Sequence, residues 1–172
     1  MTDTIQEEHM MKTSLKVFVY GTLKKGQRDH DRISEGVVSI EQASVRGRLF
    51  DLPVGDPALD IPGMDILAVG TIDPAADLDT QYRFINPSRV PLGSDFGEWR
   101  EIEGELLTFE DAATWLEVLD RVRGFSPYFF SNHRRVLLPV TIADGKVTTA
   151  WCYLIGEFLT SCASPSDETS WS

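Results

Sequence analysis

The chain has 172 residues, of which 42% are hydrophobic and 25% are charged, a balance that suits one globular domain with a sizeable core. Lys and Arg together number 16 against 27 Asp and Glu, so the formal net charge is -11. This charge disfavours nucleic acid and anionic membrane surfaces as partners, because both attract the opposite balance. A local basic spot can still bind a small anion.

The cysteine and histidine content indicates neither a disulfide scaffold nor a metal centre. The cysteines are Cys152 and Cys162, and neither they nor the three histidines have metal-ligand spacing. We therefore expect no metal site. No apolar run approaches the ~20 residues that span a bilayer, and the acidic, polar N-terminus lacks the apolar core of a signal peptide. A cytoplasmic protein is expected by default.

The first half of the chain is predicted to be mostly strands. Residues 1–13 are expected to form a flexible N-terminal arm, and residues 14–157 the folded domain. The apolar run 15–20 predicts a strand that lies centrally in the sheet. A loop is expected to follow it, with a short helix or turn within 24–33. Further predictions are strands at 45–52 and 66–72, separated by a loop at 53–62 rich in Pro, Asp and Gly.

The segment 73–99 carries scattered Pro and Gly and is predicted to be an irregular insertion that covers a cavity mouth or forms a subunit contact. A homodimer is therefore left open. A strand at 102–108 is expected next. Thr108 and Asp111 have the spacing of a helix-capping pair, which predicts a helix to about Arg121, and Gly124 is expected to stop it.

Two alternating strands, 135–143 and 146–155, flank Asp144-Gly145, which predicts a hairpin with a two-residue turn. Residues 158–172 are expected to form a flexible C-terminal tail. Strands dominate over helices throughout, so the predicted fold class is α+β: a small, closed or barrel-like mixed sheet with helical cover.

The loop after the first strand is the best candidate for a binding site. Tyr20, Gly21, Thr22 and Leu23 end an apolar strand, and Gly21 has no Cβ to keep a ligand from the main chain. Successive amide N–H groups at such a turn can form a concave site for a carboxylate or oxyanion. A plain turn is the alternative interpretation, and no phosphate-loop spacing is present.

The same stretch resembles the opening of the γ-glutamylcyclotransferase-like superfamily, which includes AIG2-like proteins and γ-glutamylamine cyclotransferases. The resemblance starts at Val-Phe-Val-Tyr-Gly-Thr-Leu-Lys-Lys-Gly-Gln, with His30 following, and covers roughly residues 15–156. Later stretches that match in order are 46–52, 57–59, 102–106, Leu119-Asp120, Gly124 and 150–153.

This resemblance implies a small mixed β-barrel with flanking helices and a reaction that needs no cofactor. In that reaction the α-amine of a γ-glutamyl group attacks its own γ-carbonyl and releases 5-oxoproline. The implied partner is a small molecule with a carboxylate or γ-glutamyl group, whose main-chain atoms the loop 20–23 binds. We expect the loop amides to encircle this anion inside a hollow barrel.

One expected catalytic residue is missing. The family has a glutamate before the glycine in a Leu-Asp-x-x-Glu-Gly pattern, whereas this chain has Arg123 before Gly124. Arginine stays protonated and cannot act as a general base. Arg123 has three interpretations: a solvated cation at a helix end, an ion pair with Asp120, or a clamp for a carboxylate or phosphate.

Other side chains are candidates for the missing proton-transfer role. Glu105 lies in a strand that is expected to line the barrel, and its alternative is an outward-facing carboxylate. Tyr128 and His133 lie near the position of the family's Tyr-x-Arg, and either could transfer a proton. Three hypotheses therefore remain: a rescued acyl-transfer enzyme or lyase, a non-catalytic anion-binding protein, and an interaction protein.

Overall fold

The computed structural model describes residues 4–5, 14–53, 57–84, 99–126, 133–155 and 164–172. The regular elements are the strands β1 (Leu15–Val19), β2 (Val37–Asp51), β3 (Pro57–Asp60), β4 (Ala68–Val69), β5 (Arg100–Phe109), β6 (His133–Ile142), β7 (Val147–Ile155) and β8 (Ser164–Pro165), and the helices α2 (Pro74–Arg83) and α3 (Ala112–Arg123). Short 3-10 turns occupy His30–Arg32, Ser34–Gly36 and Gly63–Asp65.

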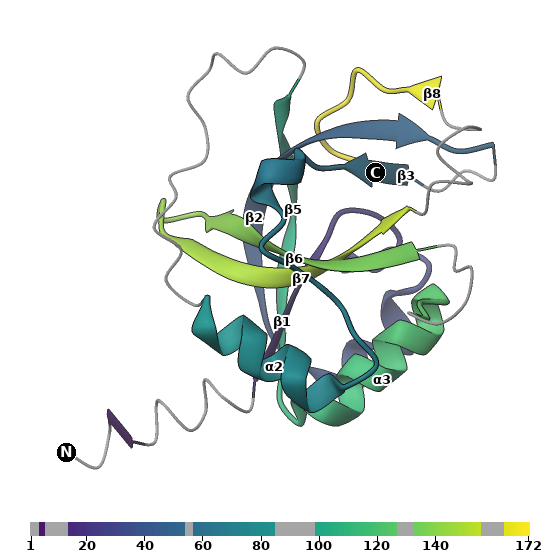
Figure 1. Ribbon diagram of the computed structural model, residues 1–172. Coiled ribbons are helices and arrows are strands. Elements are labelled where there is room, and N and C mark those ends of the chain that lie inside the picture. The colour runs from purple at the N-terminus through teal and green to yellow at the C-terminus, as the bar shows by residue number, and fades with distance from the viewer. Residues whose placement is uncertain (1–3, 6–13, 54–56, 85–98, 127–132, 156–163) are drawn as a thin grey trace.

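Five of the strands close into a barrel. The order β2-β5-β1-β7-β6 is completed by antiparallel pairing of β6 with β2, at Ala43 opposite Ile142. β1 runs antiparallel to β5 and parallel to β7, so the sheet is mixed. β3, β4 and β8 extend it at the margins. The predicted fold class, a small mixed barrel with flanking helices, is confirmed (Figure 1).

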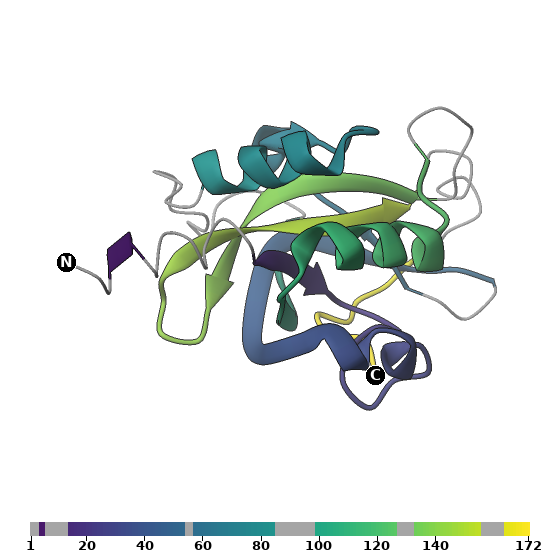
Figure 2. The same cartoon turned by 90° about the horizontal axis from the view of Figure 1, so that it is seen from below.

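The barrel wall separates two apolar cores. Along β1, Phe18 and Tyr20 belong to the core inside the barrel, whereas Val17 and Val19 belong to the core beneath the helices. α2 and α3 lie together on one side of the barrel (Figures 1 and 2). β1 is paired on both edges, and its side chains other than Lys16 are buried, in line with the prediction of a largely apolar strand that lies centrally in the sheet.

The inner core corrects the expectation of a hollow barrel. Apolar side chains from every barrel strand fill the interior, and most are under 5% exposed. Small barrels of this kind are filled by their own side chains. A ligand of the loop 20–23 therefore has to bind at the end of the barrel, where β1 leaves it, rather than within.

Several predicted elements differ in extent or kind. β2 begins at Val37 rather than 45, β3 lies inside the predicted loop 53–62, and β4 is only two residues long. Partners explain these differences: β2 pairs along its length with β5, and β3 pairs with the last residues of β2. Strand pairing of this kind is tertiary information that local composition does not carry.

The expectation of an irregular insertion over 73–99 is wrong for its first part, which forms α2. Asp73 caps this helix by accepting from the amides of Ala75 and Ala76, and Pro74 stands at its first position. This Asp-Pro pair is a helix-start signal. Residues 85–98 lie outside the described part of the chain, so the predicted cavity cover and subunit contact stay predictions.

Two predicted turns also need correction. α3 begins after Asp111, whose φ is 50° and whose side chain makes no capping bond, so the expected capping pair does not form. The β6–β7 hairpin has a longer turn than two residues, because the amide of Ile142 donates to the carbonyl of Lys146. Gly145 takes a φ of 86° within it, and Gly124 ends α3 with a φ of 65°, as predicted.

Part of the predicted C-terminal tail lies against the sheet. β8 pairs with the end of β2, and the Ser166 amide donates to the Leu49 carbonyl over 3.0 Å. The tail's flexibility stays a prediction, but residues 164–172 have specific partners. Within the described ranges, neither helix has the length and hydropathy needed to cross a bilayer.

Candidate functional site

The loop after β1 is a buried turn with its carbonyl groups already paired. Thr22 is 2% exposed and Leu23 1%. The Gly21 carbonyl accepts from the Lys24 amide over 3.0 Å, and the Thr22 carbonyl accepts from the Asp29 amide over 2.9 Å. The Leu23 carbonyl lies 2.8 Å from His30 Nδ1. These bonds fix the backbone of the loop and turn its carbonyls away from any anion.

The loop amides are differently placed. Within the described part of the chain, the N–H groups of Gly21, Thr22 and Leu23 donate to no protein acceptor. A buried N–H without an acceptor is costly, so nearly all such groups are paired with protein, water or ligand. Consecutive unpaired amide donors are the groups from which backbone anion sites are built.

A glycine is required within this loop by close packing. A Cβ placed on Gly21 would lie 2.6 Å from Cγ of Pro57, at the start of β3. Pro57 therefore presses directly on the loop backbone. Any residue with a side chain at position 21 would push the loop and β3 apart.

Arg123 reaches the same loop from the last residue of α3. Its Nη2 donates to Oγ1 of Thr22 over 3.1 Å, and its side chain is half-buried. Gly124 ends the helix directly after it, so the guanidinium leaves the helix end toward the loop. This contact sets a permanent positive charge beside the unpaired amides. It agrees with the interpretation of Arg123 as an anion clamp, whose function stays a prediction.

Asp120, the alternative ion-pair partner predicted for Arg123, pairs with Arg135 instead. Nε and Nη2 of Arg135 donate to the two carboxylate oxygens of Asp120 over 2.8 and 3.2 Å. The Tyr153 hydroxyl also donates to Asp120, over 2.6 Å. Nη1 of Arg135 lies 3.0 Å from Asp77 of α2. Arg135 is fully buried and is flanked by the rings of Phe125 and Trp151.

This buried network holds the site end of α3 in place. It joins α2, α3, β6 and β7, and the Tyr20 hydroxyl extends it by donating to the Tyr153 carbonyl over 2.8 Å. Burial raises the pKa of Asp120 above its ordinary range, although Arg135 and Tyr153 oppose the shift. Burial, with the charge of Asp120, also raises the pKa of Tyr153, which keeps its hydroxyl protonated as a donor.

Glu105 takes the alternative position of an outward-facing carboxylate, on the outer face of β5. It shares a face of β5 with Leu107 and Phe109, which lie under the helices, whereas Leu106 points inside. Glu105 is only 8% exposed, and its carboxylate accepts from the Lys25 amide over 2.6 Å. Its visible role is to hold the far end of the loop, and a catalytic role stays a prediction.

The remaining predicted residues are less closely tied to the loop. His133 begins β6, opposite Ile155 of β7, and is thus two strands from β1 at the end of the barrel where β1 stops. Tyr128 lies outside the described residues. Neither placement tests a proton-transfer role.

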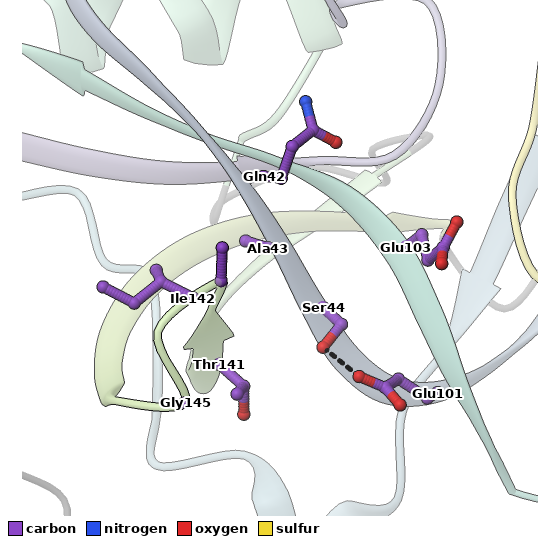
Figure 3. Close-up of a pocket in the computed structure, with 9 residues that line it drawn as sticks. Gln42, Ala43, Ser44, Glu101, Glu103, Thr141, Ile142 and Gly145 are labelled. Carbon is purple, nitrogen blue, oxygen red and sulfur yellow. Dashed lines mark hydrogen bonds between the residues drawn. The ribbon is translucent and has the colours of Figure 1, made fainter.

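A separate cavity of about 510 Å³ lies between β2, β5 and the β6–β7 hairpin, away from the loop (Figure 3). Glu101 and Glu103 supply its charge, and Ser44 donates to Glu101 over 2.7 Å. Within the described ranges, no three His, Cys, Asp or Glu side chains gather as metal ligands. The loop 20–23 contributes nothing to this cavity.

Comparison with known proteins finds a matching family model and solved structures of similar fold. Residues 17–73 match the family model of γ-glutamyl cyclotransferases, AIG2-like. An AIG2-like protein from Mus musculus superposes with a TM-score of 0.55 at 16% identity, over 93% of this chain and 89% of that one. YkqA from Bacillus subtilis superposes with a TM-score of 0.53 at 18% identity, over 92% of this chain. No curated protein matches the sequence.

The fold is γ-glutamylcyclotransferase-like. The family match begins in β1 and includes the loop 20–23, so the resemblance inferred from the first motif is confirmed. The chain spans about 39% of the length of YkqA, and the likeness to both structures concerns the fold. Sequence reasoning missed the buried Arg135 network. The available signal was an arginine within a strand whose neighbours Val136 and Leu137 are fully apolar.

Proposed function

We propose that this γ-glutamylcyclotransferase-like protein binds a small carboxylic acid at the loop 20–23, with Arg123 as a second anchor for the acid. The observation that carries the proposal is the hydrogen bond from Arg123 to Thr22 beside three buried, unpaired amides. Amide donors and a guanidinium both favour a carboxylate, and charge-assisted hydrogen bonds of this kind are the stronger ones.

Arg123 also limits which acid fits. A carboxylate on the loop amides lies within a few ångströms of the guanidinium, and so does any substituent on the adjacent carbon. An α-ammonium there would be repelled by about 1–4 kcal/mol at 4 Å, between the screening of water and that of a protein surface. The site therefore favours acids without a neighbouring ammonium and disfavours the α-ammonium form of a γ-glutamyl substrate.

Three ligands test this specificity by isothermal titration calorimetry. We expect 5-oxoproline, a carboxylate without an ammonium, to bind at least about tenfold more tightly than its neutral amide, since the charged interaction is lost. L-glutamine, the simplest γ-glutamyl amide, should also bind more weakly than 5-oxoproline. Equal binding of 5-oxoproline and its neutral amide would refute carboxylate recognition by this site.

Intramolecular acyl transfer that releases 5-oxoproline is the second candidate function. It is favoured by Glu105, a buried carboxylate 2.6 Å from the amide of Lys25 at the end of the loop. As a general base, Glu105 would take a proton from the α-amine, the nitrogen would attack the γ-carbonyl, and the leaving amine would take the proton up.

Release of 5-oxoproline from γ-glutamyl amines and dipeptides, measured by chromatography, separates the two candidates. We expect no release by the wild-type protein. If release occurs, Glu105→Gln should lower its rate at least about 100-fold while Glu103→Gln, an exposed neighbour on the same strand face, leaves it unchanged. That result would establish the enzyme and displace the binding function.

A further inference from the structure

The C-terminal residues reach the candidate site. After β8, the chain follows the barrel along β5, where the Glu103 amide donates to the Thr169 carbonyl over 2.8 Å. Two residues later, the Trp171 carbonyl accepts from Nζ of Lys24, which directly follows the loop 20–23. In Figure 2 the C-terminal end lies beside the segment that follows β1.

The same residues also face the side chain that packs on Gly21. A cavity of about 270 Å³ is lined by Pro57 on one side and by Ser170, Trp171 and Ser172 on the other. Pro57 is the side chain that packs directly on Gly21. The cavity and the Pro57 ring therefore lie between residues 170–172 and the loop whose amides are unpaired.

The tail is held by few contacts. None of residues 164–172 is fully buried, and cavities of about 270 and 230 Å³ flank them, with Ser166 and Glu168 lining both. Its described anchors are backbone hydrogen bonds, the side chain of Arg100 on the Asp167 carbonyl, and Lys24. Segments with few apolar contacts and exposed hydrogen bonds open at low free energy.

We infer that residues 164–172 form a strap that covers the loop 20–25 and competes with the ligand of that loop. The strap occupies Lys24, the cation that follows the unpaired amides, with the Trp171 carbonyl. Lifting the strap frees Lys24 and the approach past Pro57, so the open state binds an acid more tightly. The part of this inference that concerns competition with a ligand rests on the proposed function.

Ser166→Pro tests the strap in the full-length protein. Proline lacks the N–H that donates to the Leu49 carbonyl, so the variant loses one strap anchor while the barrel is untouched. Ser166→Ala keeps that N–H and serves as the matched control. In a hydrogen–deuterium exchange measurement, the Glu103 amide should exchange about three- to tenfold faster in Ser166→Pro than in the wild type. This is the increase expected when the closed strap loses the stabilisation of one or two hydrogen bonds.

Ligand binding should respond in the same direction. Ser166→Pro should bind 5-oxoproline about three- to tenfold more tightly than either the wild type or Ser166→Ala. Because coupling is reciprocal, saturating 5-oxoproline should accelerate exchange of the Glu103 amide in the wild-type protein. Faster exchange in Ser166→Pro with unchanged affinity would overturn the strap's competition with ligand, although the loop would remain a carboxylate site.

A readout without ligand separates failure of the strap from failure of the proposed function. Acetylation of Lys24 by acetic anhydride, followed by mass spectrometry, should be slower than that of the exposed Lys146 in the wild type. Ser166→Pro should raise the Lys24 rate several-fold and leave Lys146 unchanged. If no acid binds any variant but Lys24 becomes reactive, the proposed function fails and the cover over the loop stands. An unchanged Lys24 rate overturns the strap.

Discussion

Replacing Arg135 with methionine is expected to lower the free energy of unfolding by about 3–5 kcal/mol, because it leaves two carboxylates without their cation in a buried site. Asp77 and Asp120 both face Arg135, at 3.0 and 2.8 Å. For a chain of this length the loss corresponds to roughly 6–20 °C in the melting temperature. Urea unfolding followed by circular dichroism measures it.

Arg134→Met is the matched control. Arg134 is the preceding residue of β6 and is exposed, so its replacement should change stability by less than about 0.5 kcal/mol. An equal loss of unfolding free energy in Arg135→Met and Arg134→Met would show that the buried ion pairs of Arg135 do not stabilise the fold. Recovery of stability when Asp77→Asn and Asp120→Asn are added to Arg135→Met would show that unpaired charge, rather than lost packing, is the cause.

The deficit of Arg135→Met should also depend on pH. Burial raises the pKa of Asp120 in the folded protein, and Arg135 is the strongest influence that lowers it. Without Arg135 this pKa rises further above its unfolded value. A raised carboxyl pKa favours the folded state below the unfolded pKa and loses that contribution as pH rises through the folded pKa. The free energy of unfolding of the variant should therefore be closest to that of the wild type near pH 4, and the difference should grow toward pH 7.

Exchanging the charge at position 123 is expected to reverse the ligand preference of the site. Arg123→Gln removes a charge-assisted interaction worth about 1.5–3 kcal/mol, so 5-oxoproline should bind roughly 10- to 150-fold more weakly. Arg123→Glu adds a negative charge beside Thr22, which should abolish 5-oxoproline binding and favour the α-ammonium of L-glutamine. Isothermal titration calorimetry of each variant with 5-oxoproline and with L-glutamine measures the two affinities.

Arg121→Gln controls for the loss of a cation at the end of α3. Arg121 is exposed and pairs with Glu117 over 3.3 Å on the solvent side of the helix. We expect its replacement to leave both affinities unchanged. If Arg121→Gln and Arg123→Gln weaken binding equally, the effect is one of general charge and the contact with Thr22 is irrelevant. New release of 5-oxoproline by Arg123→Glu would show that the fold still positions a γ-glutamyl group for cyclisation.

Much of the barrel was predictable because its strands carry strong local signals. The largely apolar sequence of β1 matches its burial, and Asp144-Gly145 marks the β6–β7 hairpin. The loop 20–23 was expected to bind a ligand because Gly21 has no Cβ to keep a ligand from the main chain. In the structure, the side chain of Pro57 occupies the space beside Gly21, and sequence alone did not reveal this contact. The arginine before Gly124 was visible in the sequence, but the hydrogen bond of Arg123 to Thr22 was not.

What sequence reasoning missed depends on contacts between distant segments. The face of β5 on which Glu105 lies was left open by the sequence, because strand periodicity gives two faces and does not say which one is inside. Asp77, Asp120 and Arg135 lie far apart in the chain, and only the packing of α2 and α3 on the barrel brings them together. The contacts of residues 164–172 are likewise made with β2, β5 and Lys24, which a polar, Ser-rich composition does not reveal.

The parallel pairing of β1 with β7 has a consequence for how the protein is made. Val17 pairs with Trp151, so the first barrel strand has to wait until a segment far along the chain has been synthesised. Until then one edge of a largely apolar strand is unpaired, and pairings of such long sequence separation form slowly. Nascent chains should therefore need shielding from aggregation until residues 147–155 emerge.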